Sequence, residues 1–310
     1  MLVRNPPVEI SDSWWMLGTN PYPLYLFRGR QGGTMIEGGT GAMGPVLREQ
    51  LERLSIRGDV VKQVLITHAH ADHVLAVPLF RELFSGVQVV ASAPAAKTLM
   101  IEKAVAFFCK VDDILTSSLL KSGTIAEQHR RPALAANQIP VDRIVKEGDE
   151  IALDEGIALQ VFETPGHSDC SLSFFEPRQR VLLVSDATGY YLPEPDYWWP
   201  NYFTDYGTYV RSLERMAALD AEVLCLSHNA VIRGAADVAA YFRGALAATQ
   251  QYHQRIVDQA RAGQAPGEIA AALGAEVYQR TPLLPLDFFV KNCSLLVKLS
   301  LKHAGIEVGG

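Results

Sequence analysis

The first two-thirds of the chain alternate short apolar runs with turn residues, a pattern typical of strands with helices between some of them. Leu24–Phe27 and Thr34–Ile36 flank a glycine-rich stretch and predict a hairpin. Val60–Ile66, rich in β-branched residues, predicts a buried strand. Six more stretches have a strand pattern: Val87–Val90, Glu150–Leu153, Ala158–Phe162, Ser171–Phe175, Val181–Val184 and Val223–Leu226.

Helical spacing of apolar residues appears at Pro45–Leu54 and Leu79–Phe84. Two helices are expected between Pro94 and about Glu127, where they form an insertion (about residues 95–127) in the strand pattern. Helices dominate after Gly234, including Val238–Ala260 and one that starts near Pro266. The pattern predicts a mixed α/β sandwich over residues 1–234 and a helical C-terminal region over 235–310.

Composition narrows the classes of function. A net charge of −6 offers no electrostatic basis for binding nucleic acid or a membrane, so we expect neither partner. Residues 1–15 lack the basic start and apolar block of a secretory signal, and no apolar run is long enough to span a membrane. The expected location is therefore the cytoplasm. The four cysteines lie far apart, which indicates buried free thiols.

The candidate chemistry starts directly after the strand at Val60–Ile66. Four ligand-type side chains lie within six residues there, although the whole chain has only eight histidines: His68, His70, Asp72 and His73. In an extended segment the imidazoles of His68 and His70 point to the same side of the strand. The side chains of Asp72 and His73 lie at the turn into a helix and point in different directions. The cluster can thus supply two metal positions, and imidazole with carboxylate suits zinc, iron or manganese.

Three single residues follow other strands in the same manner: His167 after Thr164-Pro165-Gly166, Asp186 after Val181–Ser185, and His228 after Val223–Ser227. Each one alone is more often a turn or cap residue. Together with the cluster they gain weight, because a two-metal site needs more ligands than the cluster supplies. The other histidines, His129, His253 and His303, are interpreted as solvated or structural.

With these motifs the sequence resembles the metallo-β-lactamase-fold hydrolase superfamily, whose signature is H-x-H-x-D-H followed by a single His, a single Asp and a last His. The hairpin ending in Ile36-Glu37-Gly38-Gly39 is also similar to the family's apolar–acid–Gly turn. The resemblance covers approximately residues 14–234. It implies an αββα sandwich with the metal ions at one edge between the sheets.

The resemblance also implies a ligand set for two divalent metal ions, with zinc expected first and iron or manganese as alternatives. His68, His70 and His167 would hold the first ion, and Asp72, His73 and His228 the second, with Asp186 bridging both. The chain departs from the family pattern in two places. Val74-Leu75-Ala76 replaces a Gly-Gly pair, and Asn229 replaces a glycine after His228.

Within the superfamily, the helical insertion, the GHSD motif and the long helical tail resemble the quinolone-signal response thioesterase group most. Two metals would supply a metal-bound hydroxide as nucleophile, with Asp72 handling protons, so no Ser or Cys nucleophile is needed. The leading hypothesis is a hydrolase acting on an ester or an acyl-CoA-like thioester of small-molecule size. Aromatic residues would line its pocket: Tyr190, Tyr191, Trp198, Trp199, Phe203, Phe107 and Phe288.

Several alternatives stay open at this point. A lactonase is nearest, and a persulfide oxygenase would use a single iron instead of two ions. β-Lactam and nucleic-acid hydrolysis are less favoured, because of the helical tail and the acidic balance of charge. A regulatory protein that binds a small molecule or another protein, with incidental turnover, is a different class. A homodimer is also left open.

Overall fold

The computed structural model describes residues 1–30, 32–57, 60–135 and 137–307, and this part of the chain divides into two compact units. Gln31, in the turn of the predicted first hairpin, lies outside the described residues. The sandwich unit comprises Met1–Glu163, Cys170–Ser185 and Asp220–Val238. The helical unit comprises Thr164–Asp169, Asp186–Leu219 and the described chain from Ala239 onward.

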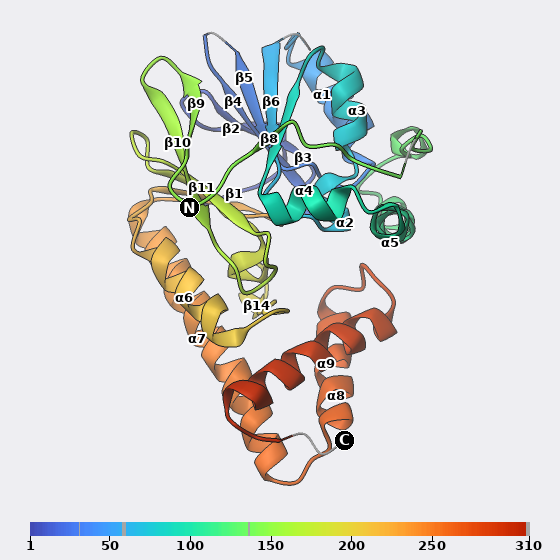
Figure 1. Ribbon diagram of the computed structural model, residues 1–310, viewed down its shortest axis with the longest axis vertical. Helices are drawn as coiled ribbons and strands as arrows, with labels where there is room; N and C mark the ends of the chain where they lie inside the picture. The colour runs from blue at the N-terminus through green and yellow to red at the C-terminus, as the bar shows by residue number, and fades with distance from the viewer. Residues whose placement is uncertain (31, 58–59, 136, 308–310) are drawn as a thin grey trace. The chain divides into compact units, whose positions relative to one another are not determined.

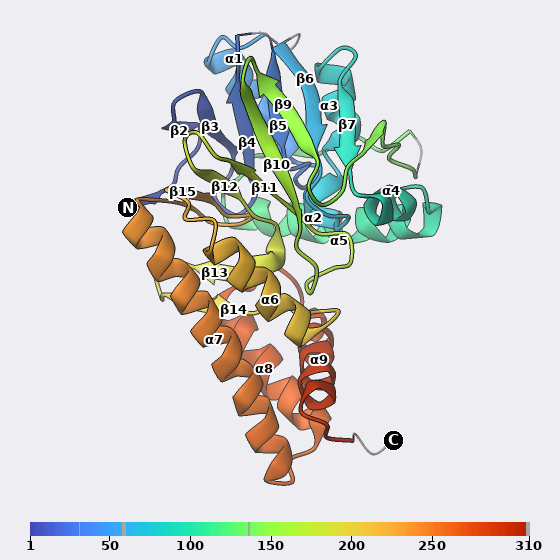
Figure 2. The same cartoon turned by 60° about the vertical axis from the view of Figure 1, so that its left-hand side comes forward.

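Within its described residues, the sandwich unit contains two seven-stranded sheets that lie face to face (Figures 1 and 2). The first sheet has the order β2 (Val8–Ser11), β3 (Trp14–Gly18), β4 (Pro23–Arg28), β5 (Gly33–Ile36), β6 (Val61–Leu65), β7 (Gln88–Ala91) and β8 (Arg143–Ile144). The second has the order β1 (Leu2–Val3), β16 (Val231–Arg233), β15 (Val223–Cys225), β12 (Val181–Leu183), β11 (Leu172–Glu176), β10 (Ile157–Glu163) and β9 (Glu150–Asp154).

Parallel pairing brings the ends of several strands to a common edge of each sheet. β5 pairs parallel with β6, and β6 with β7, so the residues after Ile36 and after Leu65 start from the same edge. In the second sheet β12 pairs parallel with β15. The predicted ligands of the sandwich unit therefore follow strand ends rather than strand centres.

The core lies between the two sheets, because alternate side chains of each strand point inward. Trp14 and Phe27 from the first sheet meet edge to face at 5.2 Å, and Phe174 and Leu183 come from the second. All four belong to one continuous cluster of buried apolar side chains. A rigid sandwich of this kind holds the loops at its edge in fixed positions.

Helices of the sandwich unit are α1 (Met43–Arg53), α2 (Ala71–Val74), α3 (Val77–Leu83), α4 (Ala93–Leu99) and α5 (Glu102–Lys121). α1 and α3 lie on the outer face of the first sheet (Figure 1). α4 and α5 confirm the predicted helix pair between Pro94 and Glu127. Asp112 of α5 is buried and accepts hydrogen bonds from the Gly41 amide and from Arg131 Nε, which ties this insertion to the loop before α1.

The helical unit contains the hairpin of β13 (Tyr190–Leu192) and β14 (Tyr197–Trp199), then α6 (Tyr206–Ala217), most of α7 (Ala235–Arg261), α8 (Pro266–Arg280) and α9 (Leu286–His303). The strands predicted from the sequence did not include this hairpin, whose two strands pair antiparallel (Figure 2). Pro193 and Pro195 lie in the turn, while the aromatic residues on either side are strong strand formers.

The mixed α/β sandwich followed by a helical C-terminal part is confirmed. None of the helices in the described part of the chain is long and apolar enough to cross a membrane. One expectation needs correction: Cys225 and Cys293 are buried free thiols, but Cys109 and Cys170 are only half-buried. Cys170 accepts a hydrogen bond from the Ala69 amide, between two of the predicted ligands.

Candidate metal centre

His68, His70, Asp72 and His73 leave the end of β6 as the spacing predicts. The backbone stays extended to His70, whose φ of −114° and ψ of 162° place it as the N-cap of α2. Asp72 and His73 then lie within α2, and the His73 amide donates to the His70 carbonyl at 3.1 Å. One short segment thus presents ligand-type side chains first from extended backbone and then from a helical turn.

Two glycines let this segment pack against the end of β5. The Gly38 amide donates to the His73 carbonyl at 2.9 Å, and a Cβ atom on Gly38 would lie only 2.5 Å from that oxygen. Gly39 has a φ of 54°, the left-handed region that favours glycine. The Ala76 amide in turn donates to the Gly38 carbonyl, and Ala76 is fully buried, so its small side chain suits the close packing there.

Glu37 orients the His73 ring through Nδ1, the ring nitrogen that does not face Asp72. Its carboxylate accepts from His73 Nδ1 at 2.9 Å and from Thr67 Oγ1 at 2.9 Å, in a fully buried setting. With its proton on Nδ1, His73 turns Nε2 toward Asp72, whose Oδ2 lies 3.5 Å away. Carboxylate–histidine pairs of this kind fix the tautomer and the ring of a metal-binding histidine.

His228 is oriented by a main-chain carbonyl instead. Its Nδ1 donates to the Pro21 carbonyl at 2.8 Å, which leaves Nε2 facing Asp72 Oδ2 at 3.8 Å. The Tyr25 hydroxyl donates to the Leu226 carbonyl and anchors the approach to His228. Burial, with Cys225 and Glu37 nearby, raises the pKa of Tyr25, so it remains a neutral donor.

Asn229, the second departure from the family pattern, has a φ of 68°. Asparagine is one of the few side chains that tolerate this left-handed conformation, so the turn after His228 keeps a backbone shape that glycine also adopts. The Asn229 amide donates to the Asn20 carbonyl at 2.7 Å, next to the carbonyl that holds His228. The substitution therefore preserves the loop rather than opening it.

His167 lies in the helical unit, on the turn after Gly166. Its Nδ1 donates to the Asn201 carbonyl at 2.8 Å, and its Nε2 lies 3.6 Å from Asp186 Oδ2. Both His167 and Asp186 are buried. Here again a backbone carbonyl fixes the tautomer that leaves Nε2 available as a ligand.

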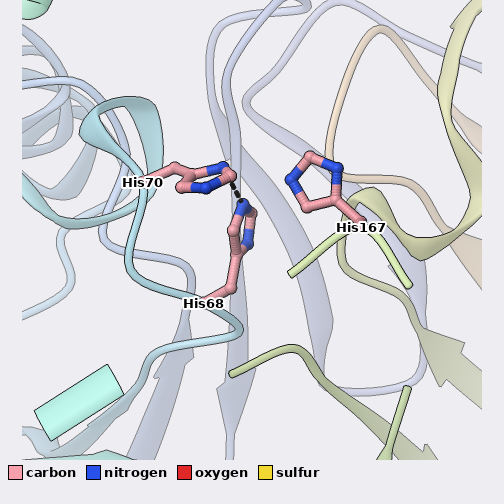
Figure 3. Close-up of side chains that lie close together, drawn as sticks. All are labelled: His68, His70 and His167. Atoms are coloured by element: carbon pink, nitrogen blue, oxygen red, sulfur yellow. Dashed lines mark hydrogen bonds between the residues drawn. The ribbon is translucent and has the colours of Figure 1, made fainter. Parts of the chain in front are cut away.

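The rings of His68 and His70 lie close together, with Nε2 of one facing Nδ1 of the other. His68 Nδ1 lies 3.2 Å from Thr67 Oγ1, and His68 Nε2 lies 3.0 Å from His70 Nδ1 (dashed in Figure 3). Among the described residues, three sets of ligand atoms lie within 4.8 Å of one another: His68 with His70 and His167 (Figure 3), His68 with His73 and Asp186, and Asp72 with His73 and His228. Together these three sets contain all seven residues that the sequence singled out.

The donor set fits divalent metal ions. Ligands bound at 2.0–2.1 Å with tetrahedral angles lie about 3.3 Å apart. The observed separations are close to that: 3.0 Å for His68 with His70, 3.5 Å for His73 with Asp72, 3.6 Å for His167 with Asp186, and 3.8 Å for His228 with Asp72. Burying so many imidazole and carboxylate groups together is costly unless they are paired or coordinate metals.

The aromatic residues expected in a pocket fall into different settings. Phe203 lies beside a candidate ligand, with its ring centroid 5.2 Å from that of His167. Tyr191 and Trp198 face each other across the hairpin at 4.5 Å, and Trp199 is buried against Phe289 of α9. The remaining three are Tyr190 and Phe288, both half-buried, and Phe107, which is 57% exposed on α5.

The other histidines lie outside these groups. His129 contacts Glu49 at 3.0 Å near the surface of the sandwich unit. His253 stacks on Tyr206 at 4.0 Å, and His303 lies 5.4 Å from His253. Sequence reasoning missed the roles of Glu37 and Asn201 as partners of His73 and His167. The acid in the Ile36-Glu37-Gly38-Gly39 turn was the one available signal, whereas a backbone carbonyl leaves none.

A family model and several solved structures are similar to this chain. The family model described as the metallo-beta-lactamase superfamily matches residues 18–228. A metallo-beta-lactamase family protein of Thermus thermophilus is similar in structure, with 22% identity, a TM-score of 0.65, and coverage of 96% of this chain and 95% of that chain. A Cronobacter sakazakii metallo-beta-lactamase with the HARLDQ motif has 19% identity and a TM-score of 0.57, covering 80% and 94%. MEM-A1, a subclass B3 metallo-beta-lactamase from a soil metagenome, has 20% identity and a TM-score of 0.57, covering 80% and 95%.

Proposed function

The chain belongs to the metallo-beta-lactamase superfamily, and we propose that it is a hydrolase that depends on two divalent metal ions and cleaves an ester or thioester bond of an acyl substrate. One observation carries the proposal. Three sets of His and Asp ligand atoms lie close together among the described residues. Three of their histidines, His73, His167 and His228, bond an acceptor through Nδ1, which leaves Nε2 available as a ligand atom. Orientation of this kind is typical of metal ligands.

In the proposed site His68, His70 and His167 would hold one ion, and Asp72, His73 and His228 would hold the other, with Asp186 as a further ligand. Bound there, the two ions would lower the pKa of a water molecule and polarise the carbonyl that it attacks. The chain's own contribution is to orient three of the imidazoles. Glu37 accepts a hydrogen bond from Nδ1 of His73, the Pro21 carbonyl from Nδ1 of His228, and the Asn201 carbonyl from Nδ1 of His167.

Asp72 is proposed to move the proton during hydrolysis. Its carboxylate faces His73 and His228 at 3.5 and 3.8 Å, yet a quarter of its side chain stays exposed while those two histidines are buried. A proton taken up by this carboxylate can therefore pass to solvent. A general base must also lie within hydrogen-bond reach of the reacting group.

An acyl group is the proposed substrate part because the chain that follows Asp186 is rich in aromatic residues. Phe203 lies beside His167, and Tyr191 and Trp198 form a paired aromatic surface on the hairpin. Apolar and aromatic walls with a few fixed polar groups are typical of sites for small ligands. The carbonyl chemistry is shared with lactones, so a lactone belongs in the test.

The test combines metal analysis with a substrate panel. Protein purified without added metal, then loaded with zinc, iron or manganese, is expected to bind about two ions per chain. It is then assayed on acyl-CoA thioesters, simple esters, a lactone and a β-lactam. His228→Ala should lower both metal content and turnover, whereas His129→Ala, which alters a histidine outside the three sets, should lower neither.

Two results would contradict the proposal. Fewer than one ion per chain under metal-replete conditions would remove the metal centre. Turnover of the lactone alone would replace the ester and thioester assignment with a lactonase. For Asp72 the relevant variant is Asp72→Asn, and full turnover with full metal content would remove its role in proton transfer.

A further inference from the structure

The turn that carries His167 is bonded on two sides within the helical unit: the Ser212 hydroxyl of α6 donates to the Pro165 carbonyl at 2.7 Å, and residues 201–205, within the stretch 199–205, bond Gly166 and His167. The Asn201 carbonyl accepts from His167 Nδ1 at 2.8 Å. The Gly166 carbonyl, one residue before His167, accepts from both the amide and the hydroxyl of Thr204 at 3.0 Å. The orientation of His167 therefore depends on the path of the main chain from Asn201 to Thr204.

Helix α9 fixes that path through a buried hydroxyl pair. Tyr202, the residue after Asn201, makes a hydrogen bond of 2.8 Å with Ser300 Oγ, and both residues are fully buried. The Tyr202 ring packs edge to face on Tyr206 at 5.2 Å. Burial raises the pKa of Tyr202 well above the range of solution experiments, so the hydroxyl stays protonated.

A second contact fixes the same stretch at its start. The buried Trp199 ring lies 5.5 Å from Phe289, near the beginning of α9. The stretch is thus held at Trp199 by one end of α9 and at Tyr202 by the other, with Asn201 between them. α9 lies beyond residues 18–228, the part of the chain that the family model matches.

We propose that Tyr202, held by Ser300, is a positioning residue for His167, and that the C-terminal helix α9 thereby sets the affinity for the metal ion that His167 binds. The inference rests on the proposed function, because it requires His167 to be a ligand. Loss of a hydrogen-bond partner behind a ligand typically weakens metal binding 10- to 100-fold. Tyr202 acts through Asn201, one step further away, so we expect about 10-fold, the low end of that range.

The experiment compares two variants with two matched controls. Tyr202→Phe and Ser300→Ala each remove one hydroxyl of the pair. Tyr206→Phe makes the same change in the neighbouring ring, and Ser294→Ala makes it at an exposed serine of α9 whose hydroxyl donates to the Val290 carbonyl of the same helix. Zinc affinities of the full chain are measured by competition with a chromophoric chelator, and folding is checked by circular dichroism and thermal melting.

Both hydroxyl variants are expected to bind one ion about 10-fold more weakly and the other unchanged, while the controls bind both as the wild type does. A general loss of packing would instead weaken both ions together. The ¹⁵N chemical shifts of the His167 ring supply a second readout: its Nδ1 proton should become less fixed in the variants. Ser300→Ala, the smaller change, decides the matter if Tyr202→Phe does not fold.

Two outcomes would overturn the inference. Wild-type binding of two ions with unchanged binding by Ser300→Ala and Tyr202→Phe would contradict the role of α9 and leave the proposed function intact. Wild-type protein that binds no metal would contradict the proposed function, and this inference with it.

Discussion

The carboxylate of Glu37 lies 2.9 Å from Nδ1 of His73, and both side chains are only 2% exposed. Glu37 itself has a φ of 77°, an unusual backbone conformation for a residue other than glycine. Strained residues of this kind persist where the surrounding structure holds them, and they are concentrated at functional sites. The strain therefore supports a functional role for the pair rather than an incidental contact.

Glu37→Gln is expected to weaken binding of the ion that His73 holds by about 10- to 100-fold. The amide offers one acceptor oxygen where the carboxylate offers two, so His73 Nδ1 and Thr67 Oγ1 no longer both donate to a charged group. Competition titration with zinc measures the loss. Glu49→Gln, which alters the exposed carboxylate beside His129, is the control. Equal affinities in Glu37→Gln and wild type would exclude the orienting role.

The cluster from His68 to His73 was predictable. It lies in one short segment between a strand and a helical turn, where residue spacing alone determines which side chains point in the same direction. Partners that lie far along the chain were not predictable. Glu37 is 36 residues from His73, and Asn201 is 34 residues from His167. Such pairs depend on strand register and loop paths, which residue patterns do not specify.

The fold shows the same division. Strands with continuous apolar runs, such as β4 and β12, were predictable because burial on both faces leaves a clear pattern. The hairpin of β13 and β14 was not, since Pro193 and Pro195 indicate a loop and only pairing of the two strands reveals that they lie in its turn. The sequence likewise gave no sign that α9 supports residue Tyr202.

Asn229 provides a test of backbone conformation at the second-metal loop. With φ at 68°, Asn229→Gly should leave the free energy of unfolding nearly unchanged, whereas Asn229→Ala should lower it by about 1–2 kcal/mol. Chemical denaturation monitored by circular dichroism measures both. Asn229→Ala should also weaken metal binding, because the Asn229 amide is bound beside the carbonyl that holds His228. Identical unfolding of the Ala and Gly variants would show that the left-handed turn carries no cost.

The stability of the helical unit is expected to depend on pH through His253. Partial burial, together with the nearby His303, lowers the pKa of His253 from its usual value. As the pH falls through the unfolded-state pKa of about 6.5, the unfolded chain takes up a proton that the folded chain does not. The free energy of unfolding is therefore highest above the unfolded-state pKa. It decreases as the pH falls from there to the folded-state pKa of His253.

His253→Phe removes this titration and keeps an aromatic ring stacked on Tyr206. Denaturation series at pH values on either side of neutrality should show a smaller decline toward acid in the variant than in the wild type. Parallel pH profiles for the two proteins would mean that His253 contributes no proton uptake to unfolding.

A substitution of Phe203 tests the substrate preference in the proposed function and leaves all seven candidate ligands in place. The half-buried Phe203 ring lies 5.2 Å from the His167 ring and 6.2 Å from that of Trp199, so Phe203→Ala removes apolar surface beside the candidate metal centre. Burying such a side chain contributes about 1.5–3 kcal/mol, which corresponds to roughly 10- to 150-fold in kcat/KM if a long acyl chain packs on it. The loss should be large for an octanoyl thioester and small for an acetyl thioester, with metal content unchanged. Tyr278→Ala, which removes an exposed ring from α8, should affect neither substrate. Equal losses for the two thioesters would mean that Phe203 supports the His167 turn and does not select the acyl chain.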